Sequence, residues 1–205
     1  MNVLAIDTSV GVSVSVLTSN GELTHAISSA HGMQGELTAE LISQTISNAG
    51  ITIAEISDVV IGVGPGPFTG LRVGIVTAVV FGYARDIPVH GICSLDAVSF
   101  DYGKPCIVVT DARRKELYWA QFNGGRIGEP QVTKPDVLAT QFSGMDFVGP
   151  GAQLYPEFIN GQVIKLRAGA LAQLFATGSA QLVEVKPMYL RKPDAVEPTI
   201  RKSVL

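Results

Sequence analysis

The first residues of the chain alternate short apolar runs with turn signals, which predicts an antiparallel β-meander. Residues 3–6 form an uninterrupted apolar run, as a buried strand does, and residues 11–17 alternate valine with serine at the period of a half-buried strand. Asn20 and Gly21 are a strong hairpin signal, so we expect a third strand over residues 22–28.

Helical and strand periods alternate further along. Apolar positions after residue 36 recur at spacings of three and four up to Gly50, a residue that commonly ends a helix. A glycine- and proline-rich loop at residues 64–67 precedes Thr69, which we expect to cap the next helix. The expected elements are a helix over residues 37–49, a strand over 58–63, a helix over 69–84 and a strand over 87–92.

The second half begins again in the same way, which indicates a duplicated α/β unit. Residues 106–110 are a buried-strand run, Asp111 breaks it, and residues 116–123 alternate as an antiparallel strand does. This pattern favours an actin-like (ASKHA, ribonuclease H-like) two-lobe α/β fold, each lobe a mixed sheet with helices. We place the lobes at residues 1–103 and 104–205. In the second we expect short strands near 146–148 and 162–166, a helix over 168–176 and an extended, exposed tail from residue 187.

Composition and charge narrow the class of protein. Hydrophobic residues make up 46% of the chain and charged residues 16%, with a net charge of −3, so the surface as a whole does not suit RNA binding without a partner. The two cysteines form no CxxC motif and favour a reducing, cytoplasmic location. The first residues lack the basic start of a signal peptide, and the apolar run at residues 73–84 is too short to span a bilayer, so we expect no membrane association.

The loop that begins at Gly64 is a candidate anion site. Glycines before a helix point backbone N–H groups at a ligand, and Arg72 could add a charged contact. Gly64, Gly66, Thr69, Gly70 and Arg72 are therefore candidate ligand residues. The motif is incomplete, because Thr69 stands where GxGxxG needs glycine and no lysine follows Gly70. A simple tight connection remains the alternative.

Two carboxylates end equivalent strands of the two halves. Asp7, followed by Thr8 and Ser9, and Asp111 could face each other across a cleft and position a metal-bound phosphate. The alternative is that each aspartate caps its own turn. Residues 113–115 are Arg-Arg-Lys, which are bulky where an actin-like phosphate loop needs glycine.

The histidines do not suggest a metal centre. His25, His31 and His90 are far apart, and no two histidines stand four residues apart, as ligands on one helix would. Neither cysteine has a catalytic context, and no GxSxG elbow is present. We predict no metal, no cofactor and no catalytic residue.

The helix from residue 73 to residue 84 is apolar on almost every side. Such a helix must be buried all round, and Gly74, Ala78 and Gly82 form a small-residue stripe that would admit another helix. A subunit interface is one explanation, and cover by a helix of the same chain is the other. The predicted interface residues are Leu41, Thr45, Leu71, Gly74, Ile75, Ala78, Val79 and Gly82, and Ala78→Glu is the variant expected to abolish pairing.

Four motifs carry a resemblance to a known family. They are LAIDTS at residues 4–9, GVGPGPFTGLRVGI at 62–75, DARRKELYWA at 111–120 and PMYLR at 187–191. In this order and spacing the chain resembles the TsaB family. Pro67 departs from the family pattern, which usually has serine there.

The resemblance implies a cytoplasmic, non-catalytic scaffold in the synthesis of threonylcarbamoyladenosine in tRNA. It implies pairing with a TsaD-type catalytic subunit through helices of the first lobe, addition of a TsaE-type ATPase, and contact with tRNA only through the complex. It also implies a homodimer when the protein is alone. Two other classes stay open: a metal-independent glycoprotease-like or ATP-binding enzyme of the same superfamily, and a free-standing interaction protein.

Overall fold

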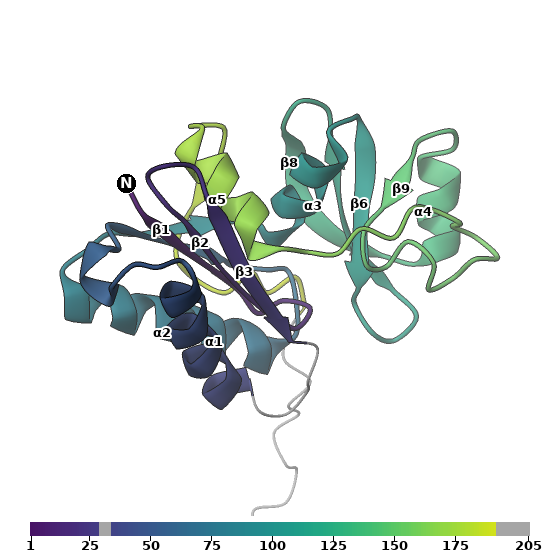
Figure 1. Cartoon of the computed structure of the whole chain (residues 1–205). Helices are drawn as coiled ribbons and strands as arrows, with labels where there is room; N and C mark the ends of the chain where they lie inside the picture. Colours follow the sequence, from purple (N-terminus) through teal and green to yellow (C-terminus); the bar gives the residue numbers. More distant parts are fainter. Residues whose placement is uncertain (29–33, 192–205) are drawn as a thin grey trace, which may run out of the picture.

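The computed structural model describes residues 1–28 and 34–191, which two β-sheets organise (Figure 1). Within these ranges the first sheet has six strands in the order β10-β5-β4-β1-β2-β3. They are β1 (Val3–Asp7), β2 (Val12–Leu17), β3 (Leu23–Ser28), β4 (Asp58–Gly62), β5 (Val89–Ile92) and β10 (Leu182–Val183). The predicted meander is confirmed, because β1, β2 and β3 pair antiparallel in chain order, while β1, β4 and β5 run parallel.

Helices cover both faces of the first sheet. On one face α1 (Gln34–Asn48) packs against β2 and β3, and α2 (Phe68–Arg85) packs mainly against β4, in one apolar cluster. On the other face lie α3 (Ser94–Tyr102) and α5 (Ala168–Ala176). The predicted half-buried strand is therefore wrong, since β2 is buried along its whole length. Its serines allow the close approach: Ser13 Oγ accepts a hydrogen bond of 2.9 Å from the backbone N–H of Ala168, at the start of α5.

The second sheet forms the other lobe. Among the described residues its order is β8-β7-β6-β9, and α4 (Pro135–Gln141) covers one face with Leu138. The other face packs against α3, which in turn packs against α5. The strands are β6 (Cys106–Asp111), β7 (Leu117–Phe122), β8 (Arg126–Thr133) and β9 (Phe147–Val148), and a short 3-10 helix, η1 (Ile53–Glu55), belongs to the first lobe.

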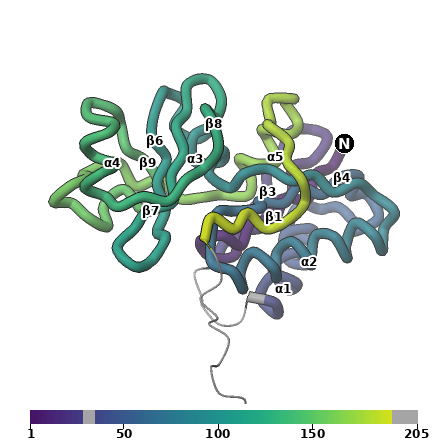
Figure 2. The backbone as a smooth tube through the Cα atoms, turned by 180° about the vertical axis from the view of Figure 1, so that it is seen from behind, coloured from purple at the N-terminus to yellow at the C-terminus, as the bar shows by residue number. Residues whose placement is uncertain are grey.

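The end of the described chain returns to the first lobe, as Figure 2 shows from behind. Helix α5 packs on the first sheet and β10 pairs antiparallel with β5. Residues 168–183, which the predicted division assigns to the second lobe, thus cover one face and extend one edge of the first sheet.

Several expected elements differ from the structure. The strand expected over residues 162–166 is a single bridge between Val148 and Gln162. Thr69 is not the N-cap of α2; Pro67 holds that position. The tail expected to be exposed is half-buried at most positions from 187 to 191, since the backbone N–H of Met188 donates to Val63 O at 2.9 Å. His31 and residues 192–205 lie outside the described residues.

Candidate ligand cleft and partner face

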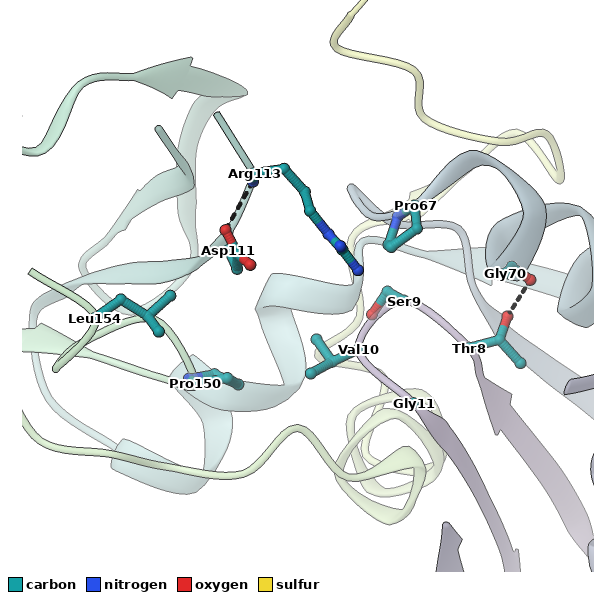
Figure 3. A pocket seen from close by; sticks show the side chains of 10 residues that line it. All are labelled: Thr8, Ser9, Val10, Gly11, Pro67, Gly70, Asp111, Arg113, Pro150 and Leu154. Atoms are coloured by element: carbon teal, nitrogen blue, oxygen red, sulfur yellow. Dashed lines mark hydrogen bonds between the residues drawn. The ribbon is translucent and has the colours of Figure 1, made fainter. Parts of the chain in front are cut away.

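A cleft of about 260 Å³ lies where the two lobes meet (Figure 3). The first lobe contributes the turn between β1 and β2 and the start of α2, and the second lobe contributes the end of β6. The lining residues are Thr8, Ser9, Val10, Gly11, Pro67, Gly70, Asp111, Arg113, Pro150 and Leu154. Of the nine candidate ligand residues, the cleft thus brings together Thr8, Ser9, Gly70 and Asp111.

Asp7 is a buried structural carboxylate, not a group that faces this cleft. Its Oδ1 accepts hydrogen bonds from the backbone N–H and the hydroxyl of Ser9 at 2.8 and 2.6 Å, and its Oδ2 accepts one from Ser94 Oγ at 2.5 Å. Burial raises the pKa of Asp7, and these hydrogen bonds oppose the rise. The predicted alternative, an aspartate that caps its own turn, describes this geometry.

The glycines of the loop allow close contact between segments. A Cβ on Gly66 would lie 2.8 Å from Ser9 O, and one on Gly70 would lie 2.6 Å from Thr8 O. Thr8 Oγ1 in turn donates to Gly70 O at 2.8 Å. Gly64 has a φ of +103° and its N–H donates to Ser94 Oγ at 3.0 Å. The loop is therefore packed against the end of β1 and the start of α3.

Asp111 ends β6 at the surface of the cleft. Its Oδ1 accepts a hydrogen bond of 2.7 Å from the backbone N–H of Arg113, so this aspartate also caps a turn. The turn then holds residues 113–115 at φ values of 62°, 54° and 59°, a left-handed conformation that glycine adopts most readily. Side chains stand where a phosphate loop would offer bare backbone.

Thr69 and Arg72 lie outside the cleft. Both are exposed on the first turns of α2. The guanidinium of Arg72 lies 3.7 Å from the centre of the Phe68 ring, and its Nε donates to Tyr189 Oη at 2.8 Å. Arg72 is thus engaged with two aromatic side chains and does not point at the glycine loop.

Other polar groups have structural partners. No group of three histidine, cysteine or acidic side chains that could hold a metal occurs in the described part of the chain. His90 Nε2 lies 3.1 Å from Asp58 Oδ1. Burial raises the pKa of the Cys93 thiol well above its ordinary value and that of Cys106 to about 11, so both stay protonated near neutral pH.

The small-residue stripe of α2 faces the chain's own first lobe. A Cβ on Gly74 would collide with the side chain of Thr8, and one on Gly82 with that of Val89, while Ala78 is fully buried. Leu71, Ile75 and Thr45 are buried as well, and Leu41 is half-buried. Of the predicted interface residues only Val79 is exposed. The neighbours of the stripe are therefore the end of β1 and the start of β5, and not a helix of this chain or of a partner.

A different face of α2 is open. Val76, Val79, Val80 and Tyr83 are exposed by 59%, 44%, 58% and 89%, so the helix is not buried all round. Beside them a groove of about 550 Å³ runs between α1 and α2. Its lining is almost entirely apolar: Ala39, Ile42, Ser43, Ile46, Ile53, Val76, Thr77, Val80 and Phe81. We call this groove, with Val79 and Tyr83, the α1–α2 face.

Sequence reasoning missed several residues that shape these sites. Ser94 holds Asp7 and Gly64 from a helix that had not been expected, and Tyr189 reaches Arg72 across 117 positions. Arg113 is expected only to obstruct a phosphate loop, yet it lines the cleft. Its place directly after a strand-ending aspartate, where a turn brings it back to the cleft, is the signal for this role.

Comparisons with known proteins agree with this architecture. A family model described as TsaD: tRNA N6-adenosine threonylcarbamoyltransferase matches residues 30–195. An uncharacterised protein of Mycobacterium leprae is 35% identical over 200 residues, which is 94% of this chain but 55% of that protein. The chain thus spans about half the length of that relative. The Escherichia coli tRNA threonylcarbamoyladenosine biosynthesis protein TsaB is 26% identical over 219 residues, covering 93% of this chain and 95% of that protein.

Two solved structures from Pseudomonas aeruginosa share the fold. YeaZ superposes with a TM-score of 0.77 at 21% identity, covering 92% of this chain and 99% of YeaZ. A protein with similarity to peptidase YEAZ superposes with a TM-score of 0.78 at 23% identity, covering 93% and 99%. The predicted actin-like two-lobe fold is confirmed. In the described ranges no helix is both long and apolar enough to cross a bilayer.

Proposed function

The chain belongs to the tRNA N6-adenosine threonylcarbamoyltransferase family, TsaD, as a TsaB/YeaZ-like member, and on this premise we propose that it serves tRNA threonylcarbamoyladenosine biosynthesis as a non-catalytic subunit. It pairs with a TsaD-type catalytic subunit and holds that subunit in an active arrangement. A TsaE-type ATPase joins the pair, and tRNA is bound by the complex, all in the cytoplasm.

The α1–α2 face carries this proposal. It presents four large exposed side chains of α2 next to an apolar groove between α1 and α2. Burying apolar surface contributes about 25 cal/mol per Å². A face of this size therefore favours association with another apolar helix pair, which a TsaD-type subunit of the same superfamily would supply. When that subunit is absent, the same face pairs with a second copy of this chain.

The cleft geometry supports a non-catalytic role. The Asp7 carboxylate accepts hydrogen bonds from Ser9 and Ser94, and Arg72 contacts Phe68 and Tyr189. The cations at residues 113–115 occupy the turn where a phosphate would need backbone N–H groups. Catalysis in a phosphate cleft depends on such preorganised donors.

An ATP-binding or metal-independent glycoprotease-like activity is the second candidate. The observation that favours it is the cleft itself, in which Thr8, Ser9, Asp111 and Arg113 line one space. Calorimetric titration of the chain with ATP and Mg²⁺ tests it. Micromolar ATP binding that is lost in Asp111→Ala would support this second candidate. The absence of a binding heat would favour the non-catalytic role.

Light scattering after gel filtration tests the pairing. We expect the wild-type chain and a TsaD-type subunit to elute as one complex, and Val80→Glu to abolish it because a charge would be buried on the α1–α2 face. Val137→Glu, which places the same charge at an equally open valine of α4, is the matched control, with Val137 exposed by 50%. An unchanged complex mass with Val80→Glu contradicts the proposal.

A further inference from the structure

The turn between β6 and β7 displays three consecutive cations. Residues 113–115 are all exposed and left-handed, and the backbone N–H of Glu116 donates to Arg113 O at 3.0 Å, which closes the turn. The turn therefore presents positive charge to whatever approaches this end of the second lobe.

This turn lies opposite the start of α2. Arg113 lines the cleft together with Pro67 and Gly70 of the first lobe, and Figure 3 shows its side chain extending from the second lobe toward Pro67 and Ser9. The residue that follows Pro67 is Phe68, the first of α2. The cationic turn and the first turn of α2 are therefore parts of one surface at the mouth of the cleft.

An aromatic pair stands on the α2 side of this surface. The rings of Phe68 and Tyr189 stack with centroids 4.8 Å apart and an interplanar angle of 22°. Both remain open to solvent, Phe68 by 41% and Tyr189 by 39%. Arg72 braces the pair through its contact with the Phe68 ring and its hydrogen bond to Tyr189 Oη.

The C-terminal segment links the aromatic pair to the cationic turn. Two residues after Tyr189, Arg191 forms an ion pair with Glu116, the residue next to Lys115. In Figure 2 this segment runs from α5 across the first lobe toward the second. Arg72, residues 113–115 and Arg191, which we call the cationic rim, therefore lie on segments that adjoin the aromatic pair, and Arg72 contacts it directly.

The charge of this surface differs in sign from that of the chain. The chain as a whole carries −3, whereas the cationic rim carries five positive charges, of which Arg191 is paired with Glu116 and Arg72 contacts the aromatic pair. Arg113 and Lys115 are exposed, and a guanidinium binds phosphate in a bidentate manner. Proteins that bind single-stranded nucleic acid combine exposed aromatic rings with nearby cations. Bases stack on the rings, and phosphates contact the cations.

We infer that the cationic rim and the aromatic pair bind RNA, with phosphates on the rim and an unstacked base on Phe68 or Tyr189. This inference rests on the proposed function, since it assigns the complex's contact with tRNA to a definite surface of this chain. An acidic protein would satisfy the charges but would gain little from two open, stacked rings. The surface lies at the cleft mouth, apart from the α1–α2 face, so a subunit bound there leaves it accessible.

The test measures binding of unmodified tRNA by the assembled complex of this chain with a TsaD-type subunit, over a series of salt concentrations. The rim variant is Arg113→Glu with Lys115→Glu, which keeps the left-handed strain at both positions. The matched control is Lys104→Glu with Lys134→Glu, an equal charge change at two exposed lysines elsewhere in the second lobe. Phe68→Ala tests stacking. Complex mass and melting temperature are recorded for every variant.

The inference predicts about tenfold weaker tRNA binding by the rim variant, and a salt slope smaller by about 1 to 2 because two phosphate contacts are lost. The control should bind as the wild type does, and Phe68→Ala should lose several-fold affinity with an unchanged salt slope. Equal binding by the rim variant and the control overturns the inference while leaving the scaffold role intact. Binding of a TsaE-type ATPase is measured on the same variants, and its loss in the rim variant without loss of tRNA binding overturns the inference in favour of an acidic protein. If the wild-type complex itself does not form, the proposed function falls and the inference with it.

Discussion

Ser94 donates a hydrogen bond to Asp7 at 2.5 Å, although 87 residues separate them in sequence. The same hydroxyl accepts the N–H of Gly64 at 3.0 Å, so one side chain fastens the end of β1 and the glycine loop to the start of α3. A Cβ on Gly62 would collide with this carboxylate. The aspartate that could be expected to hold a ligand instead holds three segments of the fold together.

Loss of the Ser94 hydroxyl should therefore destabilise the first lobe. Ser94→Ala leaves the buried Asp7 carboxylate and the Gly64 N–H short of partners, which costs about 1–3 kcal/mol. Urea unfolding followed by circular dichroism measures this loss. Ser47→Ala, at an exposed position of α1, should change the free energy of unfolding by less than about 0.5 kcal/mol. A Ser94→Ala variant as stable as this control would show that the hydrogen bonds of Ser94 do not contribute to the free energy of unfolding.

Two glutamate substitutions on α2 should behave in opposite ways. Ala78 is fully buried and Val80 is 58% exposed. Ala78→Glu should lower the free energy of unfolding by at least about 3 kcal/mol because it buries an unpaired charge, whereas Val80→Glu should leave the melting temperature of the monomer nearly unchanged. Ala78→Glu is therefore unsuitable as a test of pairing. Equal melting temperatures for the two variants would contradict the orientation of α2.

The cationic turn should carry conformational strain that glycine relieves. Lys115 has a φ of 59°, and a non-glycine residue in this region costs about 1 kcal/mol or more. Lys115→Gly should raise the free energy of unfolding by roughly 0.5–1 kcal/mol, after the greater entropy of glycine in the unfolded chain is subtracted. Lys115→Ala removes the same charge and keeps the strain, so it should not stabilise. If the two substitutions change the free energy of unfolding equally, the change comes from loss of the charge and not from relief of backbone strain.

Asp96 gives a pH dependence with a definite sign. Burial raises its pKa from 3.8 to about 6, although Arg126 Nε lies 2.9 Å from its Oδ1 and favours the ionised form. The folded protein then takes up a proton between about pH 4 and pH 6, so the stability that Asp96 contributes is present below this window and falls as pH rises through it.

Asp96→Asn cannot titrate and isolates this contribution. The free energy of unfolding of the wild type, minus that of the variant, should fall by up to about 3 kcal/mol between pH 4 and pH 7, at 1.4 kcal/mol per pKa unit. Urea unfolding at four pH values in this range measures it. A difference that grows with pH would mean that the ion pair with Arg126 outweighs burial.

Elements with a clear period were predictable, and those without one were not. β2 and α1 carry regular patterns, whereas α3 begins with five consecutive buried residues that include Ser94 and Asp96, so its polar positions do not mark a solvent-facing side. β8 contains Gly128 at a φ of +71° and Pro130, both of which break a strand pattern. The pairing of β8 with β7 shifts register between Trp119 and Gln121. Such a shift depends on both strands and cannot be predicted from the local sequence of either.

The cleft was predictable in part for a related reason. Thr8, Gly70 and Asp111 lie at the ends of predicted strands or at the start of a predicted helix, and all three line the cleft. The role of Arg72 depends on Tyr189, whose distance along the chain no local pattern spans. The direction of the small-residue stripe likewise depends on which neighbour is closer, and the chain's own Thr8 and Val89 prove to be closer.

Reconstitution of tRNA modification shows whether this protein is a required, non-catalytic subunit. Unmodified tRNA is incubated with ATP, threonine, bicarbonate, a threonylcarbamoyl-adenylate synthase, a TsaD-type subunit, a TsaE-type ATPase and this protein, each omitted in turn, and the nucleosides are measured by mass spectrometry. We expect threonylcarbamoyladenosine to form only when this protein is present, this protein alone to form none, and Val80→Glu to fail where Val137→Glu succeeds. Equal modification in the absence of this protein would contradict the scaffold role.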